Sequence, residues 1–365
     1  MFKIKKIEGK ARSGVLKTAH GKIHTPLFMP VATKGSVKLL SMEELEGCGT
    51  EAFISNAFVL SLKPGVEVIE KKGGLHKFVG WEKGIFTDSG GFQLLSKEFL
   101  EKINDKGIWF RNPFNGARHF FTPRDCIELQ NKLGSDVAMA LDDVPHANAA
   151  KKRVAEAVER TTRWAKEFVE GNENKKQLVF CISQGGSFPD LRKKSIEELK
   201  GIDGFDGIGL GGLCIGEGRE KMQRMVSVST KLMPEEKPRY LMGVGTPSDL
   251  LEAIAAGVDV FDSCFPTRTA RHGLALTSRG RMQIDRKKFQ MDFRPLDEEC
   301  GCFVCRNHSR AYIHHLFDAK EENGWKYLTF HNVFFMQNLV KEARKAIEEG
   351  AFQRFRKEMG KKQGI

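Results

Sequence analysis

Carboxylates and amides end several apolar stretches of this chain, and such residues could do acid–base or nucleophilic chemistry. The apolar stretches end at Asp88, at the adjacent Asp142 and Asp143, at Gln184 and at Asp262. A carboxylate can serve as a nucleophile, as a general acid or base, or as an acceptor for a polar ligand. A lone Asp after a strand can equally cap the next helix or turn, so each signal is weak alone.

Cys300, Cys302 and Cys305 form a second group that could do chemistry, because three thiolates within six residues suit a tetrahedral Zn²⁺. One added histidine would give a closed Cys3His site, which leaves no open position for water and predicts one structural zinc per chain. The candidates for the fourth ligand are His308, His314, His315 and His331. Spacing leaves that choice open, and the other five cysteines are isolated and expected to be buried thiols.

The elements that must position these residues repeat one pattern of apolar run, polar or glycine pair, and helix. At 240–263 an apolar run stops at Gly243, Thr246 and Pro247 start a helix, and a second apolar run reaches Asp262. Repeated units of this kind, with polar groups at successive strand ends, predict a (β/α)8 TIM barrel whose site lies on the C-terminal face. A doubly wound sheet is the alternative, but it would gather the ligand groups at one switch point.

The remaining segments are expected to decorate this scaffold within a single domain spanning 1–365. Residues 1–32 alternate like short antiparallel strands, and Asn115-Gly116 predicts a hairpin. We expect Asn56 in a loop and a long helix over 148–170, capped by Asn148. A zinc-binding subdomain is expected at about 293–335, and a final basic helix, opened by His331, at about 332–360.

The composition favours a cytoplasmic protein with a polyanionic partner. The 365 residues carry a formal net charge of +12, with 40% hydrophobic and 29% charged residues. Such an excess of positive charge favours nucleic acid, although a solvated basic surface is the alternative. No signal-peptide core or membrane span is evident, so no membrane partner is expected.

Several motifs taken together resemble the tRNA-guanine transglycosylase family, in its bacterial type. They are FTDSGGFQ at 86–93, ALDD at 140–143, QGG at 184–186, GLGGLCIGEG at 209–218, YLMGVGTPSDLLEAI at 240–254, FDSCFPTR at 261–268 and the cysteine cluster. The resemblance implies a zinc-containing barrel that exchanges guanine at the wobble position of tRNAs with G-U-N anticodons for a 7-deazaguanine. This exchange is a step of queuosine biosynthesis, and the resemblance also implies a homodimer joined through the zinc subdomain.

The resemblance also implies a role for each matching residue. Asp262 would be the nucleophile and Asp88 the general acid and base. The base would be bound by Asp88, Ser89, Gly90, Gly91, Phe92, Asp142, Gln184, Gly212, Leu213 and Met242. The anticodon loop would contact Gly243, Val244, Gly245, Thr246, Pro247, Ser248, Asp249, Thr267, Arg268, Thr269, Ala270 and Arg271. Zinc would be held by Cys300, Cys302, Cys305 and His331.

These assignments agree with the chemistry of base exchange. Replacing a base with net retention of configuration requires two displacements through a covalent ribosyl-enzyme, and guanine leaves as the first product. Asp142 can accept the N1–H and 2-amino edge that guanine shares with 7-deazaguanine. The target base must be flipped out of the RNA loop, and Phe92 and Met242 could stack on its two faces.

Two departures from the family pattern concern the incoming base. Ile215 resembles the bacterial pattern that favours the small 7-aminomethyl-7-deazaguanine, whereas Val144 resembles the pattern that accepts the larger queuine. We expect the aminomethyl base, because Ile215 takes up space directly. The alternatives are queuine salvage, a related enzyme acting on DNA, a non-catalytic barrel partner, which the three acids argue against, and a zinc hydrolase.

Overall fold

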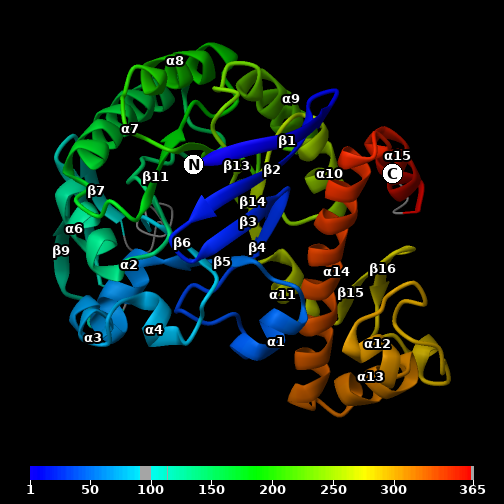
Figure 1. Cartoon of the computed structure of the whole chain (residues 1–365). Helices are drawn as coiled ribbons and strands as arrows, with labels where there is room; N and C mark the ends of the chain where they lie inside the picture. Colours follow the sequence, from blue (N-terminus) through cyan, green and yellow to red (C-terminus); the bar gives the residue numbers. More distant parts are fainter. Residues whose placement is uncertain (91–99, 113, 363–365) are drawn as a thin grey trace.

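The chain is built around one barrel, and the computed structural model describes residues 1–90, 100–112 and 114–362. Eight parallel strands form a sheet that nearly closes on itself, as the sequence predicted (Figure 1). In pairing order they are β4 (Leu27–Pro30), β14 (Val260–Ser263), β13 (Arg239–Leu241), β12 (Gly207–Leu210), β11 (Leu178–Ser183), β10 (Val137–Met139), β6 (Gly84–Asp88) and β5 (Ala52–Asn56). A parallel bridge between Val31 and Ile54 joins the two outer strands.

The interior of the barrel is filled by side chains that point inward from alternate strand positions. Phe86 packs edge-on against Phe180, and its ring also meets Tyr240. Met242 packs against the same cluster, because it lies two residues after Tyr240 and so faces the same way. A filled barrel has no pore, so ligands can bind only at its ends.

One end of the barrel is covered by the N-terminal antiparallel sheet of β1 (Phe2–Glu8), β2 (Ala11–Thr18) and β3 (Gly21–Thr25), which lies in front of the barrel strands in Figure 1. The backbone N–H of His20 donates to Asp136, which directly precedes β10, so this sheet covers the N-terminal strand ends. The antiparallel strands expected within 1–32 are confirmed. However, β4 pairs in parallel with β14 and therefore belongs to the barrel. All four of its residues are buried, as expected for a barrel strand.

Helices surround the barrel wherever an apolar face can pack on its outside. They are α1 (Met42–Gly47), α2 (Ala57–Leu60), α3 (Val66–Lys71), α4 (Leu75–Val79), α6 (Pro123–Leu133), α7 (Lys151–Gly171), α8 (Pro189–Lys200), α9 (Arg219–Thr230) and α10 (Pro247–Ala255). Thr246 caps α10 by accepting the N–H of Asp249, as predicted. Two expectations were wrong. Asn56 caps α2 through the N–H of Val59 instead of lying in a loop, and α7 begins after Ala150, so Asn148 is not its cap.

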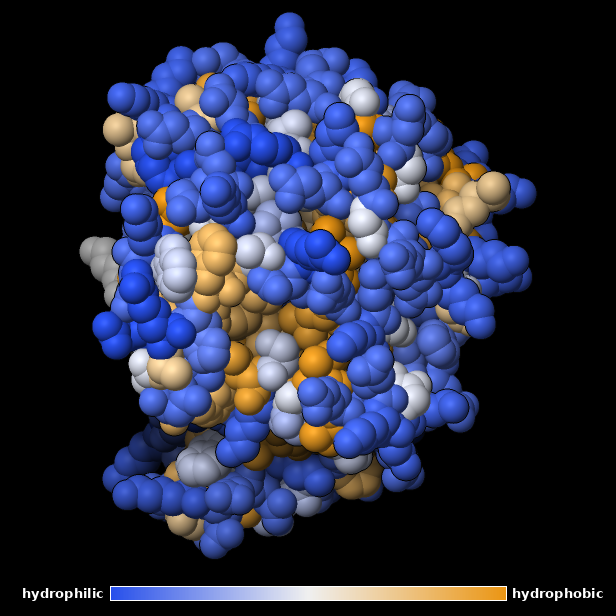
Figure 2. All heavy atoms as spheres, turned by 90° about the vertical axis from the view of Figure 1, so that its left-hand side faces the viewer, coloured by the Kyte–Doolittle hydropathy of each residue, from blue (hydrophilic) through white to orange (hydrophobic). Residues whose placement is uncertain are grey.

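A small antiparallel sheet interrupts the barrel pattern between β6 and β10. It consists of β7 (Leu100–Asn104), β8 (Gly107–Arg111) and β9 (Arg118–Phe121), and its second turn confirms the predicted hairpin. Phe110 and Phe121 pack edge-on against Phe58 of α2. A groove of about 280 Å³ remains between this sheet and helices α2 and α6. Figure 2 shows this side as mostly hydrophilic, with apolar side chains gathered in its middle.

The C-terminal quarter adds a layer on one side of the barrel, along the right of Figure 1. It contains α11 (Phe265–Ala270), β15 (Leu274–Thr277), β16 (Gly280–Gln283), α12 (Phe303–Asn307), α13 (Arg310–Asp318), α14 (Glu322–Glu348) and α15 (Phe352–Lys362). The single helix predicted for about 332–360 is therefore two helices. The chain breaks near Gly350, which has a left-handed φ of 72°. No helix in the described part of the chain is long and apolar enough to cross a membrane.

Candidate active site and metal centre

A cavity of about 770 Å³ opens at the C-terminal ends of the barrel strands, opposite the N-terminal sheet. Asp88, Asp142 and Asp262 line it together, although they come from β6, from the segment after β10 and from β14. We call this cavity the acid pocket. Of the other residues predicted to bind the base, Ser89, Gly90, Gly212, Leu213 and Met242 line it too, whereas Gly91 and Phe92 lie outside the described residues.

Asp262 lies within β14 and does not cap the helix that follows. Its Oδ1 accepts hydrogen bonds from the Tyr240 hydroxyl at 2.6 Å and from the Gly243 N–H at 3.0 Å. Burial raises the pKa of Asp262 above its ordinary value, and these two donors oppose that rise. Both donors meet the same oxygen, and Oδ2 has no donor among the described residues, so it can face a ligand.

Asp88 ends β6 beside Asn56, which ends β5. Asn56 Nδ2 donates to Asp88 Oδ2 at 3.3 Å, and the Gly90 N–H donates to Oδ1 at 3.1 Å. Burial, followed by repulsion from Asp262, raises the pKa of Asp88 to about 8, and Asp142 adds to the rise. Asp88 therefore holds a proton at neutral pH, as a general acid must.

Asp142 lines the acid pocket and forms a buried pair with Gln184, which lies behind it and does not line the cavity. Gln184 Nε2 donates to Asp142 Oδ2 at 2.7 Å, while Gln184 Oε1 is buried without a partner among the described residues. Burial raises the pKa of Asp142 to about 7, and the Gln184 hydrogen bond opposes this rise. Gly211 and Gly212 must lack side chains here, because added Cβ atoms would lie 2.6 and 2.5 Å from the Gln184 amide.

Asp143 points away from the acid pocket, although it is next to Asp142 in the chain. Its carboxylate accepts hydrogen bonds from Arg153 and Arg160 of α7, and its backbone N–H donates to Thr161. The carboxylate is fully buried, so removing either arginine would leave a buried charge with fewer partners. Asp143 thus holds α7 against the barrel and leaves Asp142 as the acid that faces a ligand.

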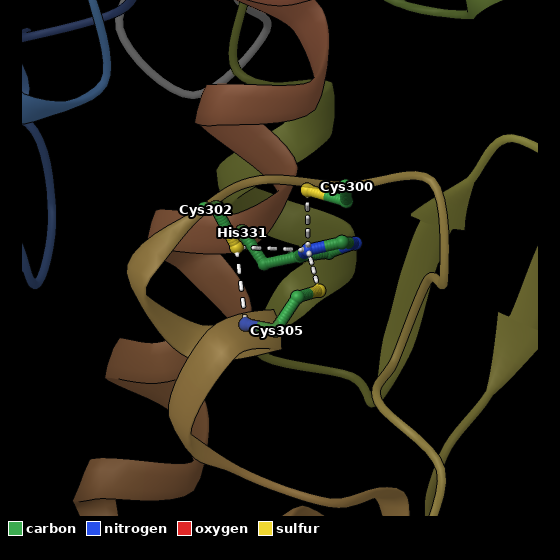
Figure 3. Close-up of side chains that lie close together, drawn as sticks. All are labelled: Cys300, Cys302, Cys305 and His331. Atoms are coloured by element: carbon green, nitrogen blue, oxygen red, sulfur yellow. Dashed lines mark hydrogen bonds between the residues drawn. The ribbon is translucent and has the colours of Figure 1, made fainter.

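The metal centre brings Cys300, Cys302 and Cys305 around His331 (Figure 3). The three sulfurs lie 3.8, 3.5 and 3.3 Å from His331 Nδ1, close to the roughly 3.6 Å between sulfur and nitrogen ligands of a tetrahedral zinc. His331 Nε2 donates to the Leu276 carbonyl at 2.8 Å, which leaves the Nδ1 lone pair free for a metal. The donor set therefore fits a metal ion.

His331 lies in the middle of α14, not at the start of a helix as predicted, so the cluster ties the cysteine loop to the longest helix of the chain. Two of the three competing histidines make other contacts, and His315 is exposed. His314 Nδ1 contacts the Ile284 carbonyl at 2.9 Å, and the His308 ring stacks on Tyr327. Three-dimensional packing thus selects His331 from the candidates that spacing left open.

Comparison with known proteins gives the family. A sequence profile described as queuine tRNA-ribosyltransferase matches residues 7–364. The chain belongs to that family. It is 49% identical over 358 residues to the queuine tRNA-ribosyltransferase of Thermotoga neapolitana and 46% identical over 357 residues to that of Fusobacterium nucleatum. These alignments cover 98% and 97% of this chain and 96% of each relative, and the recognition of a tRNA-guanine transglycosylase is confirmed.

Some of the residues of this chain that were predicted to contact RNA line the acid pocket, and others do not. Those lining the pocket are Gly243, Val244, Gly245, Thr246, Asp249 and Arg268. Pro247, Thr267 and Ala270 are buried, so they can offer RNA little more than backbone. Ser248 and Thr269 are half-buried, and Arg271 donates to the Thr267 carbonyl at 2.9 Å. Asp249 pairs with Arg219 at 2.6 Å as well as with Thr246.

Two residues of the site were not predicted from the sequence. Tyr240 donates to Asp262, and its place two residues before Met242 was a signal that it also points inward. Arg192 is fully buried and donates to the carbonyls of Ser183, Gly186 and Gly212. It thereby joins the loops after β11 and β12. Its position in the buried stripe of α8, four residues before Ile196, was its signal.

Proposed function

We propose that this protein exchanges guanine at the wobble position of tRNAs with G-U-N anticodons for 7-aminomethyl-7-deazaguanine. The observation that carries the proposal is the convergence of Asp88, Asp142 and Asp262 in one cavity on the C-terminal face of the barrel. Membership of the queuine tRNA-ribosyltransferase family supports the same reaction. The finer points proposed below are the covalent path, the role of each residue, the incoming base and the identity of the metal.

In the first displacement, Asp262 Oδ2 attacks the anomeric carbon of the wobble nucleotide, and the bond from that carbon to guanine breaks. Donors from Tyr240 and Gly243 to Oδ1 hold the carboxylate in position and favour its ionised form. Asp88, which is protonated at neutral pH, gives its proton to the departing guanine. The products are free guanine and an ester between the ribose and Asp262.

In the second displacement, the incoming base attacks the same carbon from the face that guanine vacated, and the ester to Asp262 breaks. Asp88 is now ionised and takes the proton that the incoming base loses. Two inversions give net retention, so the modified nucleotide keeps its original configuration. Asp88 ends protonated again and is ready for another cycle.

Asp142 is proposed to recognise the base by accepting its N1–H and 2-amino hydrogens. Asp142→Ala should weaken guanine binding roughly 10- to 100-fold, because a buried hydrogen bond to a charged group contributes about 1.5–3 kcal/mol. Its pKa of about 7 adds a pH effect: wild-type guanine affinity should fall as the pH drops below about 7 and Asp142 takes up a proton. Calorimetric titration with guanine checks both. Unchanged affinity in Asp142→Ala would contradict this role.

The incoming base is proposed to be the aminomethyl form, although Ile215 favours this base and Val144 favours queuine. Val144 and Ile215 both line the acid pocket, so both lie where a substituent of the bound base could reach them. The bulk of Ile215, held by a hydrogen bond from its N–H to Glu217, supports the smaller base. Queuine remains the alternative.

Exchange of labelled guanine into an unmodified tRNA with a G-U-N anticodon tests the proposal directly. The labelled tRNA is then chased separately with 7-aminomethyl-7-deazaguanine and with queuine. Release of label by the aminomethyl base supports the proposed function, and release by queuine alone would identify the alternative. If labelled guanine is not incorporated, the proposed reaction is wrong.

The metal is proposed to be a structural Zn²⁺, held by Cys300, Cys302, Cys305 and His331. Removing it with a chelator, or changing Cys302 to Ser, should lower the melting temperature by roughly 10 °C or more, because metal binding contributes directly to folding. Elemental analysis and thermal unfolding check this. One zinc per wild-type chain is expected, and a variant that loses zinc without loss of stability would contradict a structural role.

A homodimer joined through the zinc subdomain is also proposed. Large apolar side chains are exposed there: Met291 is 75% exposed, Phe293 72%, Phe303 47% and Tyr312 41%. Contiguous exposed apolar side chains typically mark an interaction surface. Sedimentation equilibrium measures the assembly, and a monomer at micromolar concentration would exclude it.

A further inference from the structure

A second cavity, of about 550 Å³, lies on the zinc side of the chain, and positive charge dominates its lining. Six cationic side chains line it: Arg279, Arg281, Arg286, Lys288, Arg294 and Arg310. Two acids, Asp297 and Glu298, also line it. We call this cavity the basic hollow. It is formed by the β15–β16 hairpin, the turn around Lys288 and the start of α13.

Three of these cations have nearby carboxylates. Arg279 pairs with Glu298 at 3.1 Å, and Arg294 and Arg310 share Asp292 at 2.7 and 3.0 Å. The other three cations are Arg281, Arg286 and Lys288. In the described part of the chain, no carboxylate lies within ion-pair distance of them. All three are exposed, so their charges are available to a ligand.

The basic hollow adjoins the acid pocket through one contact. The Arg281 guanidinium lies 5.5 Å from the centre of the Phe265 ring, and Phe265 also lines the acid pocket. Arg268, on the same short helix α11, lines the acid pocket as well. Positive charge therefore lies on both sides of this contact, at Arg268 in the acid pocket and at Arg281 in the basic hollow.

We propose that the basic hollow binds backbone phosphates of the anticodon stem of the tRNA. One arginine guanidinium can donate two parallel hydrogen bonds to the oxygens of one phosphate. A polar cavity whose cations lack carboxylate partners suits a polyanion better than it suits an apolar partner. The nucleotides next to the flipped base contact the loops around the acid pocket. A site beyond α11 consequently meets phosphates farther along the RNA. This inference rests on the proposed function, because it takes the same tRNA as the ligand.

The test compares two variants that lose the same number of positive charges. One combines Arg281→Ala, Arg286→Ala and Lys288→Ala, and the control combines Lys3→Ala, Lys5→Ala and Lys6→Ala on β1, at the opposite end of the barrel. Dissociation constants are measured against salt for an unmodified tRNA with a G-U-N anticodon. They are also measured for a short hairpin in which only a few base pairs close the anticodon loop.

The hollow variant should bind the tRNA at least about tenfold more weakly at low salt, with a salt slope lower by about 2–3. Its affinity for the short hairpin should change less than about twofold, and its kcat for guanine exchange should stay unchanged while KM for tRNA rises. A single Arg286→Glu variant should show the same direction of change and guards against misfolding of the triple variant.

Three results would overturn the inference: equal weakening by the β1 control, equal weakening on the hairpin, or conversion of a dimer into monomers by the hollow variant. The first would indicate nonspecific attraction, the second a contact confined to the loop, and the third an interface between copies of the chain. Failure of the proposed function is a separate result, because the wild type itself would then not exchange guanine.

Discussion

Replacing Asp262 with Asn is expected to abolish both guanine exchange and the covalent adduct with tRNA. The amide offers no anionic oxygen to attack the anomeric carbon, so the loss should be at least about 10⁴-fold, as for other essential nucleophiles. Asn has nearly the same size and can still accept the Tyr240 and Gly243 hydrogen bonds through its carbonyl oxygen. The fold and the affinity for tRNA should therefore remain close to those of the wild type.

A denaturing gel measures the adduct, and binding of labelled tRNA measures affinity in the same samples. Tyr240→Phe is the matched control, because it removes one donor to Asp262 and leaves the proposed nucleophile in place. It should form the adduct but exchange guanine roughly 10- to 100-fold more slowly. An adduct that resists denaturant in Asp262→Asn would show that another residue is the nucleophile.

The sequence predicted the fold because each barrel unit carries its own local signals. Thr246 and Pro247 mark the start of α10, and the apolar runs on either side are short enough to be strands. β4 was not predicted to be a barrel strand, because Leu27–Pro30 follows three antiparallel strands without an intervening helix. Only its pairing with β14, far along the chain, makes it a barrel strand.

The residues of the acid pocket were predictable where a carboxylate directly ends an apolar run, as at Asp88 and Asp262. Their partners were not, since hydrogen bonds such as Tyr240 to Asp262 join different strands. The two acids at 142 and 143 look alike in the sequence, and only Arg153 and Arg160 of α7 turn one of them away from the pocket. His331 was likewise selected by the Leu276 carbonyl of β15, a contact between segments 55 residues apart.

The three pocket carboxyls cannot all be charged at neutral pH without strong repulsion, and their surroundings decide which one holds the proton. Asp262 receives two donors on one oxygen, including the Tyr240 hydroxyl, whose own pKa is raised well above its ordinary value by burial and by Asp262. Among the described residues, the donors to Asp88 are Asn56 and Gly90, at the longer distances of 3.3 and 3.1 Å. These contacts therefore favour the proton on Asp88 and the charge on the proposed nucleophile.

Replacing Asp88 with Asn is expected to slow guanine exchange roughly 10²- to 10⁴-fold, because an amide cannot give a proton to the departing base. In the wild type, the rate of guanine release should fall as the pH rises through about 8, where Asp88 loses its proton. That decline should be absent from the residual activity of Asp88→Asn. Single-turnover release of labelled guanine between pH 6 and 9.5 measures both effects.

The raised pKa of Asp88 also predicts that Asp88→Asn, although it slows the reaction, stabilises the fold at pH 8. Measuring stability therefore separates loss of chemistry from loss of fold. Because the pKa of Asp88 is raised from 3.8 to about 8, the folded chain keeps a proton that the unfolded chain releases between these values. The contribution of Asp88 to wild-type stability therefore decreases as the pH rises from about 4 to 8. Asp88→Asn escapes this loss, so at pH 8 it should unfold at a higher temperature than the wild type. A variant that is inactive and also less stable at pH 8 would argue that Asp88 supports the fold instead of the proton transfer.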